Sequence, residues 1–175
     1  MTESSQTTQL VRNLADKLRQ SGDQLVFAES CTAGLASATL AEVPGISQHL
    51  CGSAVVYQVP TKVAWLKIAP DIIDSEGYAS EAVARAMSAG VLNLTSHATL
   101  AAAITGDLGP DAPAETDGTA WIAVESQDGR SLTKLVELPD SVPDNPKEPG
   151  LSLRLYRQRA AVSHLLNTIL EFLDS

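Results

Sequence analysis

A predicted strand-to-helix turn spans residues 24–34, Gln24-Leu25-Val26-Phe27-Ala28-Glu29-Ser30-Cys31-Thr32-Ala33-Gly34. Its apolar beginning predicts a strand over residues 24–28. The small and apolar residues that follow predict a helix over 32–42, ended by Pro44-Gly45. A hydroxyl and a thiol, Ser30 and Cys31, therefore lie at a strand-to-helix turn. Free backbone N–H groups and the helix dipole favour developing negative charge there.

Helices and strands alternate on both sides of this turn. We expect further helices over 6–21, 61–67, 80–95 and 152–173, and further strands over 51–57, 98–104, 119–125 and 131–138. Gln127-Asp128-Gly129 joins the last two strands and is a hairpin signal. Residues 139–150 contain four prolines and predict an irregular loop. The pattern predicts an α/β layered domain with a mixed sheet that is mostly parallel, with one antiparallel strand, in a single domain over residues 1–175.

Composition narrows the classes of function. The formal net charge of -9 argues against a broad nucleic-acid interface, because phosphate binding needs clustered Lys and Arg. No apolar run of about 18 residues is present, so we expect no membrane span. The polar N-terminus shows no signal peptide, and the two cysteines make no disulfide framework. We therefore expect a cytoplasmic protein.

Three polar residues are candidates for one catalytic site. Ser30 needs a nearby base to act as a nucleophile, and Lys62 can serve if burial lowers its pKa. Tyr57 ends a predicted strand, where its hydroxyl can relay a proton. Each has an ordinary structural alternative: a helix cap for Ser30, an exposed lysine at a helix start for Lys62, and a strand-end aromatic for Tyr57.

Other chemistries have weaker support in the sequence. Cys31 is a rival nucleophile, but no histidine lies in a motif with it, so a small buried side chain is the better interpretation. The three scattered histidines predict no metal site. The turn-rich loop 105–118 can cradle an anion with its backbone N–H groups, although it is not a Walker motif. One of the three arginines that begin the last helix can face a phosphate: Arg154, Arg157 or Arg159.

A series of motifs in fixed order resembles the CinA C-terminal domain family, also called the nicotinamide mononucleotide deamidase (PncC) family. Residues 28–34 resemble its Ala-Glu-Ser-Cys-Thr-Gly-Gly, and Val43-Pro44-Gly45-Ile46-Ser47 resembles Val-Pro-Gly-Ala-Ser. Tyr57 and Lys62 keep the spacing of its Tyr-Ser-Asn-Glu-Ala-Lys. Residues 77–84 resemble Gly-Ala-Val-Ser-Glu-Glu-Val-Ala, residues 105–110 resemble Thr-Gly-Ile-Ala-Gly-Pro, and residues 118–121 resemble Gly-Thr-Val-Trp. The resemblance covers about residues 10–173.

The resemblance implies a three-layer α/β/α sandwich and an amidohydrolase that needs no metal or other cofactor. It implies deamidation of nicotinamide mononucleotide to nicotinate mononucleotide and ammonia. Ser30 would attack the carboxamide, Lys62 would take its proton, and Tyr57 would assist. The residues carried over as substrate-binding are Glu29, Thr32, Gly34, Thr105, Gly106, Gly109 and Arg154. We expect a nucleotide as the small-molecule substrate and a homo-oligomeric assembly.

The chain also departs from the family pattern. Ala33 replaces the first glycine of the Gly-Gly pair. Residues 111–117 replace a Gly-rich stretch with a shorter one that adds three acids, and added negative charge near a substrate phosphate would repel it. Two alternatives therefore stay open: a catalytically weak domain that binds a nucleotide or a protein, and an amidase for another, uncharged or cationic amide.

Overall fold

The computed structural model describes residues 3–110, 112–143 and 150–175, with side chains from residue 6 onward. Five strands and six α-helices, with one short 3-10 helix η1, follow one another along these residues. In chain order they are α1 (Glu3–Ser21), β1 (Leu25–Glu29), α2 (Leu35–Ala41), η1 (Ile46–Gln48), β2 (Leu50–Val55), α3 (Val59–Leu66), α4 (Pro70–Glu76), α5 (Glu81–Leu94), β3 (Leu100–Asp107), β4 (Thr119–Ser126), β5 (Ser131–Glu137) and α6 (Leu153–Asp174).

The strands form one mixed sheet in the order β2-β1-β3-β4-β5. β1 lies between β2 and β3 and runs parallel to both, with Ala28 opposite Ala54 and Ala103. β4 runs antiparallel to β3 and to β5. The predicted mixed sheet with one antiparallel strand is therefore confirmed. Because β1 is an interior strand with a parallel neighbour on each side, its carboxyl end opens at the edge where α/β sheets usually bind ligands.

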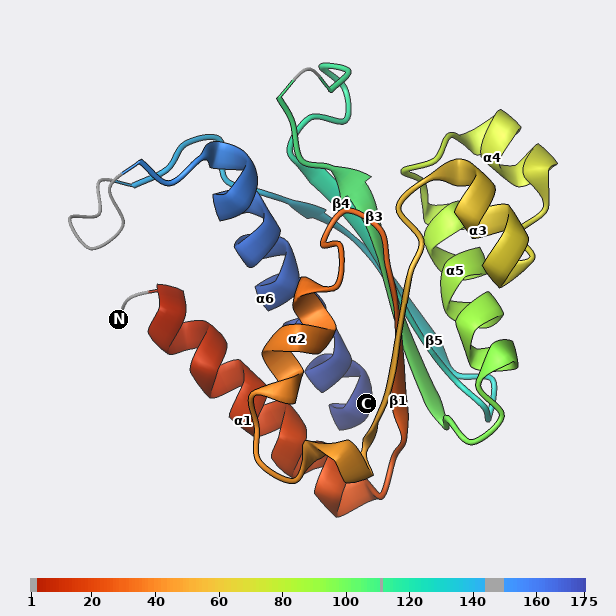
Figure 1. The fold of residues 1–175 in the computed structure, drawn as a ribbon, viewed down its shortest axis with the longest axis vertical. Helices are drawn as coiled ribbons and strands as arrows, with labels where there is room; N and C mark the ends of the chain where they lie inside the picture. Colours follow the sequence, from red (N-terminus) through yellow and green to blue (C-terminus); the bar gives the residue numbers. More distant parts are fainter. Residues whose placement is uncertain (1–2, 111, 144–149) are drawn as a thin grey trace.

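Helices cover both faces of the sheet and give the three-layer sandwich that the resemblance implied. Figure 1 shows α1, α2 and α6 on one face, and α3, α4 and α5 on the other. Successive residues of β1 alternate between two apolar cores. Leu25 and Phe27 pack in the core with α1 and α6, whereas Val26 and Ala28 pack in the core with α5. Burial on both faces explains why β1 is uniformly apolar until Glu29.

Several element boundaries differ from those expected. β2 ends at Val55, so Tyr57 follows the strand rather than ending it. Helix α4 was not predicted, although Pro70 begins it at a position that favours proline. Residues 139–143 form neither helix nor strand, as expected, while 144–149 lie outside the described residues. None of the described helices is long and apolar enough to cross a membrane.

The predicted helix over 32–42 was wrong at its start, because α2 begins only at Leu35. Ala33 and Gly34 adopt the left-handed conformation, with φ of 53° and 97°, and this interrupts the helical path after Ser30. Gly34 is the N-cap residue of α2. Ser30 therefore does not cap α2, because the helix begins only after Gly34.

Candidate active site

Ser30 and Lys62 are in direct contact at the carboxyl end of β1. The Lys62 Nζ donates to Ser30 Oγ at 2.8 Å and to the Val56 carbonyl at 3.0 Å. The Tyr57 carbonyl lies at 3.5 Å, the outer limit for a third hydrogen bond. The Ser30 backbone N–H donates to Ile104 of β3, which fixes the residue to the sheet. Of the two interpretations of Ser30, the geometry favours the one in which its hydroxyl meets a base.

Burial lowers the pKa of Lys62, which favours a role as a base. Lys62 is only 1% exposed, although it is one of the few charged side chains in a core position. Loss of hydration disfavours its charged form and lowers the pKa of Lys62 to about 8. About one molecule in ten then carries a neutral amine at pH 7. A neutral amine can donate its two hydrogens to the carbonyls of Val56 and Tyr57 and accept the Ser30 proton with its lone pair.

Glu29 holds the turn that presents Ser30. Its carboxylate is fully buried and accepts hydrogen bonds from the backbone N–H groups of Gly34, Ala36 and Ser37, each at 3.0 Å. The Thr32 hydroxyl also donates to it at 2.8 Å. The carboxylate thus accepts hydrogen bonds from the first N–H groups of α2. A negative charge is favourable at this position because it lies at the positive end of the helix dipole.

A pocket of about 210 Å³ opens over this pair. Its lining combines the nucleophile candidate with residues from β3, the following loop and α6. The lining residues are Ser30, Cys31, Tyr57, Tyr78, Gly106, Asp107, Leu108, Gly109, Pro110, Ala112 and Arg154. The volume is below the roughly 300–1,000 Å³ of typical ligand pockets, so it suits the reacting end of a ligand.

Five of the predicted residues line this pocket: Ser30, Tyr57, Gly106, Gly109 and Arg154. Lys62 lies beneath its floor. Four residues carried over as substrate contacts do not line it: Glu29, Thr32, Gly34 and Thr105. The first three form the turn described above, and Thr105 is buried with its hydroxyl on the Tyr78 carbonyl at 2.9 Å. These four residues support the residues that face the pocket.

Arg154 is the arginine that faces the pocket. Its guanidinium donates to the Tyr57 hydroxyl at 2.6 Å and to the Gly109 carbonyl. Arg157 is instead buried, with a hydrogen bond to the Pro139 carbonyl at 2.9 Å and an ion pair to Asp117 at 2.9 Å. Arg157 therefore anchors the loop over residues 105–118 and leaves Arg154 as the cationic group of the lining.

Two glycines shape the loop wall because a side chain has no room there. A Cβ on Gly106 would lie 2.4 Å from the Thr119 carbonyl oxygen. Gly109 has φ of 60°, and a Cβ there would meet the Asp117 carboxylate at 2.5 Å. The loop backbone therefore packs directly against its neighbours and stays close to the pocket.

The acids of the loop are placed differently from the sequence-based expectation. Asp117 is paired with Arg157, and Glu115 is exposed outside the lining, while Asp111 lies outside the described residues. The acid that does line the pocket is Asp107, which the sequence reasoning did not single out. Tyr78, also missed, donates its hydroxyl to Asp107 at 2.9 Å. Tyr78 and Asp107 replace apolar residues of the family motifs quoted above. These two departures from the motifs are the sequence signal that could have identified the pair.

Cys31 has the properties of a structural side chain. It is 4% exposed, and burial raises the pKa of its thiol to about 12, so the reactive thiolate is disfavoured. None of the three histidines lines the pocket. Within the described part of the chain, no three His, Cys, Asp or Glu side chains are grouped to hold a metal ion.

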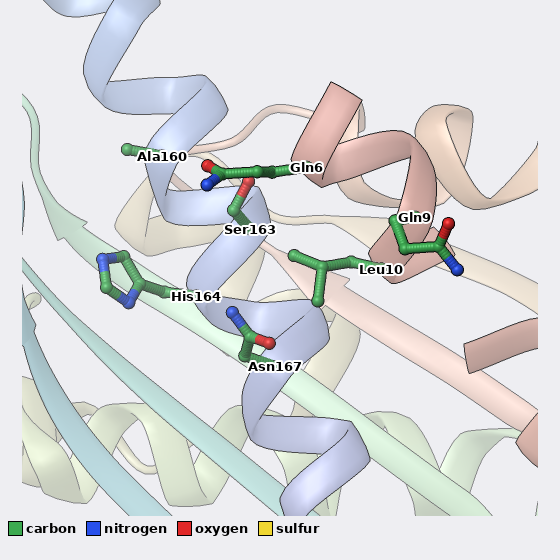
Figure 2. Close-up of a pocket in the computed structure, with 7 residues that line it drawn as sticks. All are labelled: Gln6, Gln9, Leu10, Ala160, Ser163, His164 and Asn167. Carbon is green, nitrogen blue, oxygen red and sulfur yellow. The ribbon is translucent and has the colours of Figure 1, made fainter. Parts of the chain in front are cut away.

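A larger hollow of about 450 Å³ lies elsewhere, between α1 and α6. Figure 2 shows its lining, including Gln6, Leu10, Ser163 and His164. Ser163 Oγ shares a hydrogen bond with Thr7 Oγ1 at 2.9 Å, which ties the two helices together. The hollow is therefore a groove between packed helices, and we assign the chemistry to the smaller pocket that holds Ser30.

The fold and the site together define an α/β/α domain with a serine–lysine pair at the carboxyl end of the interior strand β1. Residues 7–146 match the family model described as the CinA C-terminal domain. The chain belongs to this family.

Relatives and solved structures agree with that assignment. A CinA-like protein of Mycobacterium tuberculosis H37Rv is 41% identical over 125 residues, which is 70% of this chain and 29% of the relative. A CinA-like protein of Mycobacterium marinum is 37% identical over 164 residues, which is 92% of this chain and 37% of the relative. The chain thus spans about a third of the length of these curated relatives.

The crystal structure of competence/damage inducible protein CihA from Agrobacterium tumefaciens has the same fold. It gives a TM-score of 0.84 at 26% identity, covering 97% of this chain and 96% of that one. The competence damage-inducible protein A from Klebsiella pneumoniae gives 0.84 at 25% identity, with 96% and 97% covered.

Proposed function

We propose that the protein is an amidohydrolase that deamidates nicotinamide mononucleotide by a serine–lysine mechanism. The observation that carries the proposal is the 2.8 Å contact between Lys62 Nζ and Ser30 Oγ beneath an open pocket. A hydroxyl in contact with a buried amine whose pKa lies near 8 is an activated nucleophile. The family resemblance supplies the substrate, and the Arg154 guanidinium in the pocket lining suits its phosphate.

In the first half of the reaction, Ser30 Oγ attacks the carboxamide carbon as neutral Lys62 accepts its proton. The resulting oxyanion needs hydrogen-bond donors. The backbone N–H groups of Cys31 and Thr32 directly follow the nucleophile and are the candidate donors. Collapse of the tetrahedral intermediate breaks the C–N bond. The leaving nitrogen takes a proton from protonated Lys62, with help from the Tyr57 hydroxyl, and departs as ammonia.

In the second half, water replaces ammonia. Lys62, again neutral, takes a proton from water, which attacks the ester carbon. Collapse of the second intermediate breaks the bond to Ser30 Oγ, which regains its proton from Lys62. The products are the carboxylate and the free enzyme, so no cofactor enters the balance.

The direct test is release of ammonia from nicotinamide mononucleotide by the purified protein. The native protein and Cys31→Ala are expected to release ammonia, whereas Ser30→Ala is expected to lose at least about 10³-fold in turnover. No release by the native protein at high enzyme and substrate would refute the proposed activity. Loss of activity in Cys31→Ala with retention in Ser30→Ala would reassign the nucleophile.

A further inference from the structure

Tyr78 and Asp107 form a fixed wall of the pocket. Tyr78 precedes α5, and Asp107 is the last residue of β3. The Tyr78 hydroxyl donates to Asp107 Oδ1 at 2.9 Å, and the Thr116 hydroxyl donates to Asp107 Oδ2 at 2.6 Å. Thr105 holds the Tyr78 backbone from below. Each oxygen of the carboxylate is thus held by a separate hydroxyl, which sets its orientation toward the pocket.

The pocket lining carries one negative and one positive side chain, Asp107 and Arg154. Among the described residues, no Lys, Arg or His forms an ion pair with Asp107, and no Asp or Glu forms one with Arg154. Asp107 is half-buried, and hydroxyl donors satisfy its hydrogen bonds without neutralising its charge. A partly desolvated carboxylate left in this state favours a ligand that brings a cation.

Two aromatic side chains lie in the same lining. Tyr57 and Tyr78 are 51% and 46% exposed, an unusual state for large aromatics that a ring-shaped ligand would relieve. Tyrosine faces also attract cations. The site therefore offers aromatic surface, one carboxylate and one guanidinium around the nucleophile.

We propose that Asp107, held in place by Tyr78 and Thr116, is a specificity-determining residue that selects amides carried on a positively charged aromatic ring. This inference rests on the proposed amidohydrolase activity and deepens it. Arg154 takes the anionic end of such a ligand, and Asp107 compensates the ring charge. A pyridinium carboxamide fits this charge pattern, whereas the same carboxamide on an uncharged ring leaves Asp107 without a partner.

The same charge bears on the question raised by the acidic segment. Asp117 and Glu115 do not line the pocket, whereas Asp107 does. Asp107 lines the same pocket as Ser30, so the proposal places it against the ring that carries the scissile amide. Negative charge there favours a cationic ring, while a phosphate at the Arg154 side stays near positive charge.

The test measures binding of two small probes that differ by one methyl group and one charge: the 1-methylnicotinamide cation and neutral nicotinamide. Their dissociation constants are measured by ligand-observed NMR on the native protein, Asp107→Asn and Asp107→Ile. Asparagine keeps the shape without the charge, and isoleucine is the residue of the family motif, which protects the test against misfolding of either variant. Glu115→Gln is the matched control, since it removes one exposed charge from the same loop outside the lining.

We expect the native protein and Glu115→Gln to bind the cation more tightly than the neutral probe. Both Asp107 variants are expected to weaken cation binding about tenfold and to change neutral binding less than about twofold. Equal losses for both probes, no loss, or no binding of either probe at the highest soluble concentration would overturn the inference. Because no turnover is involved, a native protein that fails to release ammonia yet prefers the cation refutes the proposed function alone. Normal turnover with an unchanged probe preference in the Asp107 variants refutes the inference alone.

Discussion

Replacing Lys62 with methionine should remove the part of the pH dependence of stability that comes from this buried amine. The folded protein releases the Lys62 proton near pH 8, whereas the unfolded chain holds it to the ordinary value of 10.5. Between these values the unfolded state binds more protons, so the free energy of unfolding rises with pH. The native protein therefore carries a penalty for burying a charged amine at pH 7, and this penalty disappears above pH 10.5.

The magnitude follows from the shift. A difference of about 2.5 pKa units corresponds to roughly 3 kcal/mol when the amine is fully charged. Most of this, about 2–3 kcal/mol, is recovered between pH 7 and pH 10. Methionine keeps the length of the side chain but cannot titrate. The stability of the native protein minus that of Lys62→Met should thus rise by about 2–3 kcal/mol over this interval.

Urea denaturation at several pH values measures this difference, in which the titration of other groups cancels. Lys67→Met is the matched control, because Lys67 is an exposed lysine at the end of the same helix. Its curve should run parallel to that of the native protein. A native-minus-Lys62→Met difference that stays constant from pH 7 to pH 10 would refute the idea that burial tunes this lysine.

Four further outcomes follow from the same contacts. The kcat/KM of the native enzyme should rise with pH along a limb centred near pH 8, as the buried lysine becomes neutral; a flat profile would contradict its role as base. Tyr57→Phe should lower kcat about 10²-fold with little effect on melting temperature, since the half-exposed hydroxyl lines the pocket. Ala33→Gly should stabilise the fold by about 0.5–1 kcal/mol in urea titrations, because relief of left-handed strain exceeds the added entropy of the unfolded chain. Asp117→Asn should cost about 1–2 kcal/mol by leaving the buried Arg157 without its closest carboxylate, and an unchanged melting temperature would argue that the pair contributes nothing.

The layered fold was predictable because its strands and helices have distinct periodicities. β1 is apolar on both faces, and α6 carries an apolar stripe, so both are visible in the sequence. The start of α2 was not predictable from composition. It depends on the left-handed conformations of Ala33 and Gly34, whose backbone N–H groups donate to the Ser30 carbonyl and to the Glu29 carboxylate, respectively.

Spacing and resemblance named Ser30 and Lys62 as candidates for one site, but their contact and the burial of the lysine required the fold. Lys62 reaches Ser30 only because α3 carries it beneath the end of β1. The pair of Tyr78 and Asp107 joins positions 29 residues apart, and no local pattern signals such a contact. The acids of residues 111–117 show the same limit. They are close together in the sequence, but in the fold Asp117 pairs with Arg157 of α6 and does not line the pocket.

The most direct test of the serine–lysine mechanism is the mass of the peptide containing Ser30 after rapid acid quenching of native enzyme during turnover of nicotinamide mononucleotide. We expect an ester adduct with the mass of the substrate minus ammonia on Ser30. The adduct should persist in Cys31→Ala and be absent in Ser30→Ala. An adduct on Cys31, or unmodified Ser30 in an enzyme that is turning over, would contradict the mechanism.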